Sequence, residues 1–251
     1  LISFPGETWV NGLNDENFSG NQGTPNARTA GDIIDPVTIR PVDRYNNLAP
    51  GNRNVTLSCP SGYFSLPDYP GNVVNIDNPT DIRVVLRSAD QLQYLRAESS
   101  GINANDSSPV TISPDGYARM VVAAPGETLD PGIFDTIEDD GKVGSPSVQD
   151  AGVPFSVHVY ATDAYWNPVS DVDPALPLAM DFSSSDGVAF LPANPQSISG
   201  NNGDFAVTLI TLADPNHQTV RIDDNSTAVF AFTTVPMKAG VIDHFDVGIN
   251  N

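Results

Sequence analysis

The sequence predicts an all-β chain made of two tandem β-sandwich domains, and three observations lead to this fold class. A segment of about 120 residues occurs twice, proline is frequent along the whole chain, and apolar residues alternate with polar ones over short stretches. An internal repeat of this length indicates duplicated domains. Proline excludes long helices, and period-two alternation is typical of half-buried antiparallel strands.

The repeat is defined by short motifs that return in the same order. Pro5-Gly6-Glu7-Thr8 returns as Pro125-Gly126-Glu127-Thr128, Ala30-Gly31 as Ala151-Gly152, and Asp43-Arg44-Tyr45-Asn46-Asn47 as Asp163-Ala164-Tyr165-Trp166-Asn167. From these matches we expect one domain over residues 1–120 and a second over residues 121–238. Residues 239–251 then form a tail that resembles the first strand of a following unit.

Each repeat contains about seven short strands separated by turn signals, which is the pattern of an immunoglobulin-like Greek-key sandwich. The alternation also predicts the side chains of two separate cores. For the first domain these are Val37, Ile39, Leu57, Val84, Leu86, Leu95 and Ala97, and for the second Phe155, Val157, Val159, Phe182, Val207, Leu209, Val220 and Ile222.

The second repeat also resembles a known family. It reads Ala151-Gly152-Val153-Pro154-Phe155, then Asp163-Ala164-Tyr165-Trp166-Asn167-Pro168-Val169, with Ser183-Ser184-Ser185-Asp186 farther on. This pattern resembles the bacterial immunoglobulin-like tandem repeats of large secreted, cell-surface and adhesin-type proteins. The first repeat departs from it, with 32–36 in place of the Val-Pro-Phe stretch. The resemblance implies a structural or adhesive role outside the cell.

The charge balance excludes several kinds of partner. The net charge is −20, from 31 acidic residues against 11 basic ones. Binding to nucleic acid requires a basic surface that neutralises phosphates, and the sequence has none, so we expect no nucleic-acid partner. No stretch reaches the 18 apolar residues that a membrane span requires, and we expect no membrane insertion.

The acidic loop of the second repeat has two interpretations. Its side chains Asp135, Glu138, Asp139 and Asp140 follow the Pro-Gly-Glu-Thr motif, and 14–17 occupy the matching place in the first repeat. Clustered carboxylates are ligands for Ca²⁺, which is the one cofactor that the sequence suggests. The spacing is not that of an EF-hand, and an ordinary solvated loop is the other interpretation.

The Asp-x-Tyr-x-Asn motif is interpreted first as a turn, because Asp and Asn side chains cap turns by bonding to nearby backbone. Tyr165 and Trp166 within it leave a second reading open. An exposed aromatic pair could stack on sugar rings and make the chain a carbohydrate-binding or adhesive module that binds surface glycans. The alternative is that both rings pack against a neighbouring loop or domain.

The sequence gives no motif for catalysis. The three histidines, His158, His217 and His244, do not occupy matched positions in the two repeats, and no Gly-x-Ser-x-Gly or His-Glu-x-x-His pattern is present. We therefore expect a protein that is not an enzyme and that has no catalytic residues.

The expected function is structural: an extracellular, cell-surface segment that acts as a stalk, a spacer or a head-to-tail filament building block. The expected partners are neighbouring copies of the chain or adjacent repeats of a longer one. A strand with an open edge invites pairing with another chain. The residues predicted to make this assembly contact are Val241, Ile242, Phe245 and Val247 of the tail and Leu1, Ile2 and Phe4 of the first domain.

Overall fold

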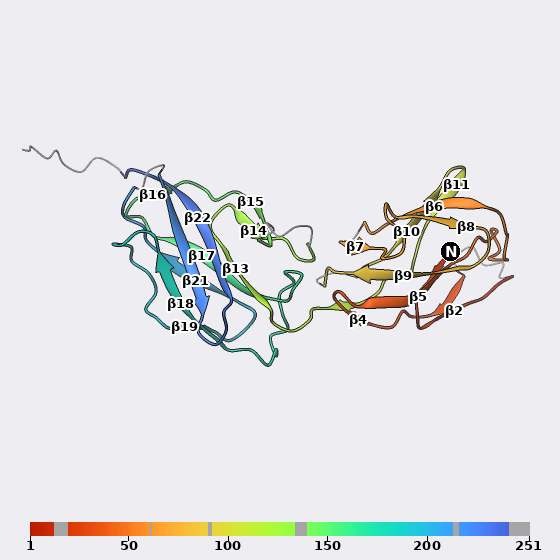
Figure 1. The fold of residues 1–251 in the computed structure, drawn as a ribbon, viewed down its shortest axis with the longest axis horizontal. Coiled ribbons are helices and arrows are strands. Elements are labelled where there is room, and N and C mark those ends of the chain that lie inside the picture. The colour runs from red at the N-terminus through yellow and green to blue at the C-terminus, as the bar shows by residue number, and fades with distance from the viewer. Residues whose placement is uncertain (13–19, 61, 90–91, 134–139, 213–215, 241–251) are drawn as a thin grey trace, which may run out of the picture. The chain divides into compact units, whose positions relative to one another are not determined.

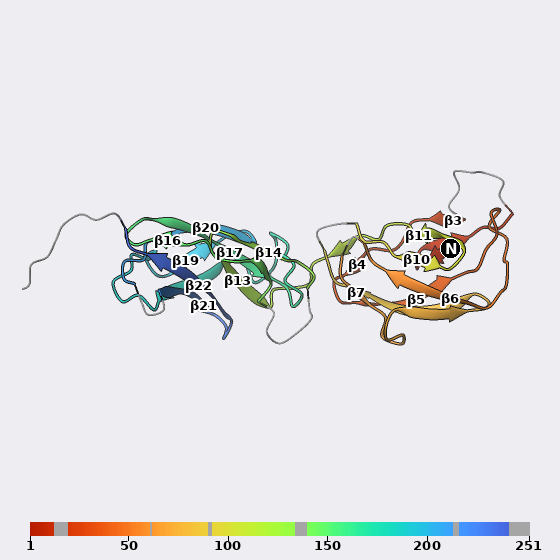
Figure 2. The same ribbon diagram turned by 90° about the horizontal axis from the view of Figure 1, so that it is seen from above.

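The computed structural model describes residues 1–12, 20–60, 62–89, 92–133, 140–212 and 216–240. The chain forms two compact units. Unit 1 comprises Leu1–Gly116 together with two loops of the second repeat, Asp130–Gly141 and Asp163–Val169; unit 2 comprises Tyr117–Leu129, Lys142–Thr162 and Ser170–Asn251. The domain boundaries expected at residues 120 and 238 stay predictions. All regular elements of the described residues are strands, which confirms the all-β fold class (Figures 1 and 2).

The strands of unit 1 form a sandwich of two four-stranded sheets. In chain order they are β1 (Ile2–Ser3), β2 (Glu7–Trp9), β3 (Asn21–Gly23), β4 (Arg28–Thr29), β5 (Ile33–Ile39), β6 (Arg53–Ser58), β7 (Phe64–Ser65), β8 (Val73–Ile76), β9 (Thr80–Leu86), β10 (Arg96–Ser99), β11 (Ile102–Asp106) and β12 (Ile112–Ser113). One sheet has the order β1-β5-β9-β7 and the other β11-β10-β6-β8. The pairs β2–β3 and β4–β12 complete the unit.

The strands of unit 2 repeat this arrangement. They are β13 (Arg119–Ala123), β14 (Glu127–Leu129), β15 (Lys142–Gly144), β16 (Gln149–Asp150), β17 (Phe155–Thr162), β18 (Leu178–Ser184), β19 (Gln196–Ile198), β20 (Asn202–Val207), β21 (His217–Asp224) and β22 (Phe230–Lys238). A three-stranded sheet has the order β13-β17-β20, and a five-stranded sheet the order β16-β22-β21-β18-β19. The remaining pair is the hairpin β14–β15.

The two strand orders agree in their central strands, although the sheets have four and four strands in unit 1 and three and five in unit 2. In each unit the first strand pairs with the long strand that follows the Ala-Gly motif (β1 with β5, β13 with β17). In each unit the next strand, β6 or β18, then lies in the other sheet. The short strand before the Ala-Gly motif pairs in parallel with the last strand, as β4–β12 and as β16–β22. This order is that of an immunoglobulin-like Greek-key sandwich, which confirms the predicted fold.

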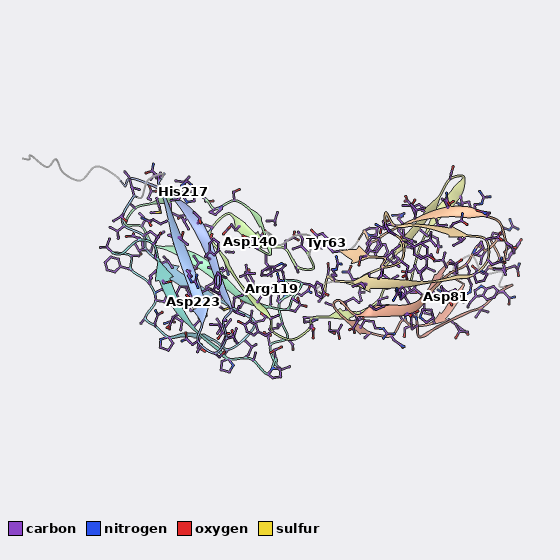
Figure 3. The ribbon with its side chains drawn as sticks, in the orientation of Figure 1. Tyr63, Asp81, Arg119, Asp140, His217 and Asp223 are labelled. Carbon is purple, nitrogen blue, oxygen red and sulfur yellow. The ribbon has the colours of Figure 1, made fainter. Side chains whose placement is uncertain are left out.

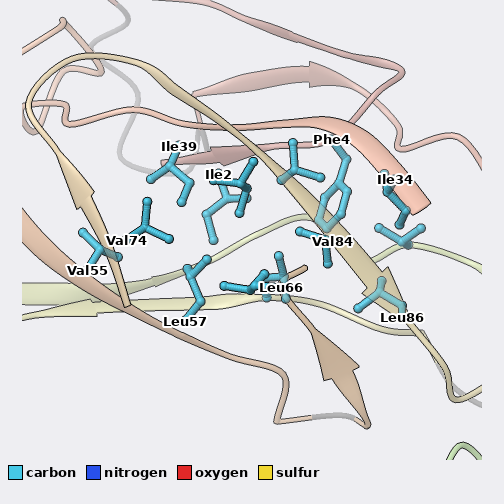
Figure 4. Close-up of a cluster of buried hydrophobic side chains, with 14 of the residues drawn as sticks. Ile2, Phe4, Ile34, Ile39, Val55, Leu57, Leu66, Val74, Val84 and Leu86 are labelled. Atoms are coloured by element: carbon cyan, nitrogen blue, oxygen red, sulfur yellow. The ribbon is translucent and has the colours of Figure 1, made fainter. Parts of the chain in front are cut away.

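Alternating side chains fill the core of unit 1 between its sheets (Figure 4). Ile34, Val37 and Ile39 of β5 point inward from one sheet, and Val55 and Leu57 of β6 from the other. Burying an aliphatic side chain of this size contributes roughly 1.5–3 kcal/mol. All predicted core residues of both units are buried except Ala97. That residue is only half-buried, because it lies where the register of β10 against β11 shifts.

Three features differ from the sequence-based expectation. Strand β11 was missed, because its residues are polar or exposed throughout and show no alternation. The loops after the Pro-Gly-Glu-Thr motifs begin and end in the hairpins β2–β3 and β14–β15. Strand β5 starts at Ile33, ahead of the alternating residues Val37 and Ile39 from which it is predicted. Pro36 lies where the register of β5 against β9 shifts, a position that does not require the missing N–H.

Candidate functional site

The Asp-x-Tyr-x-Asn motif forms the same turn in both repeats. We call them the Asp43 turn (residues 43–47) and the Asp163 turn (residues 163–167). In the first, Asp43 Oδ1 accepts hydrogen bonds from the backbone N–H groups of Tyr45 (2.8 Å) and Asn47 (2.9 Å). In the second, Asp163 Oδ1 accepts from Tyr165 (2.8 Å) and Asn167 (3.0 Å). The predicted capping role of these aspartates is therefore confirmed.

The backbone of the two turns also agrees. Asn46 and Trp166 occupy the matching position and have φ angles of 62° and 65°. The carbonyl of Tyr45 accepts a hydrogen bond from Gly12 N (3.0 Å), and that of Tyr165 accepts one from Gly132 N (2.8 Å). Both turns thus present the tyrosine and the last asparagine in the same local geometry.

The Asp163 turn lies within unit 1, on a surface that we define by Gly31, Arg87, Ala89 and Asp115 and call the Gly31 surface. Asn167 Nδ2 donates to Arg87 O (2.8 Å), and Ala89 N donates to Asn167 Oδ1 (2.9 Å). Asp115 N donates to Asp163 Oδ2 (3.1 Å). One asparagine side chain therefore satisfies a backbone donor and a backbone acceptor, which are costly to leave unpaired when buried.

Packing accompanies these hydrogen bonds. The ring of Tyr165 lies against Gly31, where a Cβ atom would come within 2.2 Å of Tyr165 Cε2. The Arg87 guanidinium lies 5.9 Å from the centre of the same ring. Asp163 and Asn167 are 0% exposed, whereas Asp43 is exposed and Asn47 half-buried. Sequence reasoning missed the Gly31 surface, although the Ala-Gly motif had been found as part of the repeat.

The aromatic pair predicted as an alternative ligand site is not exposed as a pair. Trp166 is 7% exposed, and its ring lies against Gly141, where a Cβ atom would come within 2.4 Å of Trp166 Cδ2. Tyr165 is half-buried and packs against the core of unit 1. Packing was the other interpretation left open by the sequence, and these contacts agree with it. Carbohydrate binding stays a prediction, with no exposed Trp166 ring to support it.

A glutamate seals the outer edge of the first strand in each unit. Glu7 Oε2 accepts from Phe4 N (2.7 Å), and Glu127 Oε2 accepts from Ala124 N (2.8 Å). The neighbouring carbonyls are bonded as well: Ile2 O accepts from Asn21 Nδ2 (2.7 Å), and Val122 O from Lys142 Nζ (3.2 Å). Side chains therefore occupy edge groups that would otherwise be open to another strand.

In unit 2 this edge contains a buried ion pair. Lys142 Nζ lies 2.9 Å from Glu127 Oε1, and both side chains are almost fully buried. Thr233 Oγ1 donates to Glu127 Oε2 (2.7 Å). In unit 1 Asn21 occupies the position that Lys142 has in unit 2. Ser108 Oγ donates to Glu7 Oε1 (2.5 Å). The glutamate at this edge therefore has a charged partner, Lys142, in unit 2. In unit 1 the partners of the glutamate are neutral.

The residues predicted for assembly have different positions. Ile2 and Phe4 are buried in the core of unit 1, and Leu1 is half-buried. Strand β1, which contains Ile2, pairs with β5 on its inner side. Val241, Ile242, Phe245 and Val247 lie outside the described residues. The assembly contact of the tail stays a prediction.

The predicted metal ligands lie mostly outside the described part of the chain. Asp135, Glu138 and Asp139 are not among the described residues, nor are 14–17 of the first repeat, and Asp140 is exposed. Within the described ranges no group of three or more His, Cys, Asp or Glu side chains is arranged to hold a metal ion. Two side chains of these types in one strand, His217 and Asp223, lie at opposite ends of β21 (Figure 3). Calcium binding by the acidic loop stays a prediction.

Two buried aspartates of unit 2 are held in the charged form by hydrogen bonds. Burial raises the pKa of Asp186, but donors at Ile210, Thr211 and Val188 outweigh burial and keep this pKa below its ordinary value. Burial likewise raises the pKa of Asp224, and hydrogen bonds from Thr227, Ser226 and Tyr117 bring it below the ordinary value. Both carboxylates fix loops, since each accepts bonds from residues of its own turn.

Tyr117 is the counterpart of Asp224. Its hydroxyl donates to Asp224 Oδ2 (3.0 Å). Burial, together with the negative charge of Asp224, raises the pKa of Tyr117 well above its ordinary value. The pair connects the start of unit 2 to the end of β21.

Among the described residues, the structure contains no helix with the length and hydrophobicity of a membrane span.

Comparison with known proteins gives likeness to solved structures alone. No family model matches the chain, and no curated protein sequence matches it. The apo structure of Bacteroides uniformis beta-glucuronidase 3 is 10% identical over 94% of this chain with a TM-score of 0.32. This chain spans 24% of that protein.

Two tandem structures match over most of their own length. The Clostridium thermocellum CbhA fibronectin(III)-like modules are 10% identical, cover 99% of this chain and 100% of theirs, and have a TM-score of 0.26. The titin Ig tandem is 9% identical, covers 85% and 92%, and has a TM-score of 0.25. Scores of this size carry no argument about function. The strand order above shows that the chain consists of tandem immunoglobulin-like modules.

Proposed function

We propose that the chain is a structural segment of an extracellular surface protein or fibre, in which the modules serve as a stalk, a spacer or a head-to-tail building block. One observation carries the proposal: the Asp-x-Tyr-x-Asn turn of the second repeat is buried on the Gly31 surface of unit 1. Residues that could have formed a ligand site in that turn pack within unit 1 instead. The proposal assigns the chain no catalytic role.

The duplication supports the same role. Both units contain the capped Asp turn, the glutamate-sealed edge strand and the parallel pairing of the last strand. Duplicating a module lengthens a spacer without requiring a new site. The net charge of −20 keeps such surfaces apart and soluble, as an extended surface segment requires. The extracellular location is also part of the proposal and rests on the sequence resemblance.

Pulling single molecules of the full chain by its two ends tests this function. A structural segment should resist load, so we expect two separate unfolding events, one for each compact unit. Each event should release on the order of 400 Å of chain, because an extended residue spans at most about 3.6 Å. Extension without resolved events would contradict the proposal. A binding module without a mechanical role has no need to resist force at all.

A further inference from the structure

We propose that the Asp43 turn of one copy of the chain docks on unit 2 of a second copy, on a surface defined by Gly152, Val153, Ile210, Leu212 and Gly240, here called the Gly152 surface. This inference rests on the proposed structural function and specifies its assembly contact. The template is the contact inside unit 1, where the Asp163 turn lies on the Gly31 surface. The second copy repeats that contact with the matching turn and the matching surface.

The Asp43 turn has the geometry of a bound turn. Its backbone and its aspartate cap match those of the Asp163 turn. Asn167 uses its side-chain amide to bond Arg87 O and Ala89 N as well as Asp163. The Asn47 amide donates to Asp43 Oδ2 (3.1 Å) at an exposed site. The same polar groups are therefore presented to solvent in the first repeat and buried in the second.

The glycine under the tyrosine ring is also repeated. Gly31 N donates to Leu86 O (2.9 Å), and Gly152 N donates to Leu209 O (2.8 Å). Their φ angles are +86° and +81°. A Cβ atom on Gly31 would collide with the Tyr165 ring, whereas no atom of the described residues lies within 4 Å of the same position on Gly152. Among these residues the position above Gly152 in unit 2 is thus open, whereas the matching position above Gly31 in unit 1 is occupied by the Tyr165 ring.

Exposed apolar side chains belong to the same surface. Val153 is 52% exposed and Leu212 is 44% exposed. Counted from the matched residues Leu86 and Leu209, Leu212 takes the place of Ala89, the residue that bonds Asn167 in unit 1. A tyrosine ring seated on Gly152 would cover both aliphatic side chains and remove them from water, which favours association.

The Asp43 turn carries a charge that the Asp163 turn lacks. It contains Arg44, which stacks 4.4 Å from the centre of the Tyr45 ring, whereas the Asp163 turn has Ala164 at that position. Both copies have a net charge of −20, which opposes association, and Arg44 places one positive charge beside the docking ring. The contact joins different surfaces of the two copies, so each added copy presents a further turn or surface and the contact can repeat head to tail.

A disulfide trapping experiment on the full chain tests the contact. Every variant has Cys59→Ser to remove the native thiol. Asn167→Cys with Ala89→Cys in one chain tests the template: an intramolecular disulfide is expected if the two residues are neighbours in solution, as the bond from Ala89 N to Asn167 Oδ1 (2.9 Å) indicates. Asn47→Cys and Leu212→Cys in separate chains, mixed and oxidised, should give a mixed dimer. Asn103→Cys, at an exposed site on β11, replaces Asn47→Cys in the control mixture.

The proposal expects several-fold more mixed dimer from the Asn47–Leu212 pair than from the control pair. Equal yields would overturn it. Sedimentation velocity provides an independent measurement: the wild type should associate as its concentration rises, Tyr45→Phe should retain association, and Tyr45→Ala should lose it. A wild type that stays monomeric, or an alanine variant that associates equally, would also overturn it. Either result leaves the force measurement on single chains unaffected, so the two proposals fail separately.

Discussion

The ring of Tyr165 lies against Gly31 so closely that a Cβ atom on this glycine would come within 2.2 Å of Tyr165 Cε2. No larger residue fits there without moving the ring. At the corresponding glycine of the second repeat, Gly152, the described residues leave the same position open. The repeat therefore provides two matching glycines, of which one lies under a tyrosine ring.

Gly31→Ala and Gly152→Ala should separate backbone strain from steric exclusion. Both glycines have positive φ, so each alanine costs about 1 kcal/mol for the left-handed conformation. Gly31→Ala must also displace Tyr165 and should lower the free energy of unfolding by about 3 kcal/mol in total. Urea unfolding followed by circular dichroism measures both variants. Equal losses would show that the ring does not lie on Gly31 in solution.

Asn167→Ala should be much more destabilising than Asn47→Ala. Removing the Asn167 amide leaves Arg87 O and Ala89 N without the bonds that they make at 2.8 and 2.9 Å, which costs about 2–3 kcal/mol for buried backbone groups. Asn47 caps an exposed turn, and its loss should cost about 0.5 kcal/mol. Tryptophan fluorescence reports on unit 1, which contains both Trp9 and Trp166. Similar costs would contradict the contact.

Glu127→Gln should destabilise the protein more than Glu7→Gln. Glu127 balances the charge of buried Lys142, and an unbalanced buried ammonium costs about 3 kcal/mol. Glu7 accepts bonds from Phe4 N and Ser108 Oγ without a lysine, and glutamine can keep one of them. The double variant Glu127→Gln, Lys142→Met should recover part of the loss in the same urea experiment. No recovery would mean that the charge of Lys142 is not the cause.

Acid should unfold unit 2 through Asp186 and Asp224. Both have a pKa below the ordinary value in the folded protein, so the unfolded chain binds protons more readily. The stability that they provide is complete above the unfolded pKa of about 3.9 and is lost as the pH falls through the lower folded pKa. Asp224→Asn should therefore flatten the dependence of the free energy of unfolding on pH below about 4. An unchanged slope would show that Asp224 is not held in its charged form.

The core was predictable because apolar and polar residues alternate in β5, β6 and β17, and this pattern indicates which side chains face inward. Val37 and Ile39, or Val157 and Val159, needed no tertiary information. Strand β11 was not predictable, since its side chains are exposed on both faces and it is a strand through its pairing with β10. The Asp turns were predicted from their chemistry alone.

The Gly31 surface could not be predicted in the same way. Gly31, Ala89 and Asn167 lie far apart in the sequence, and two of the contacts with Asn167 are made by backbone atoms that carry no residue signature. The motif repeat marks Ala30-Gly31 and Tyr165 as positions of interest. The motif repeat does not indicate that these residues are in contact. Their contact follows only from the fold, in which the sheets place the end of β9 beside the Asp163 turn.

Amide hydrogen exchange at Ala89 tests the central claim most directly, because this N–H donates to Asn167 Oδ1 at 2.9 Å. If the Asp163 turn is bound to the Gly31 surface in solution, the Ala89 amide is protected in the wild type and exchanges much faster in Asn167→Ala. The amide of Leu212, the matching position in unit 2, should exchange equally in both proteins at low concentration. An Ala89 amide that exchanges at the same rate with and without Asn167 would contradict the account.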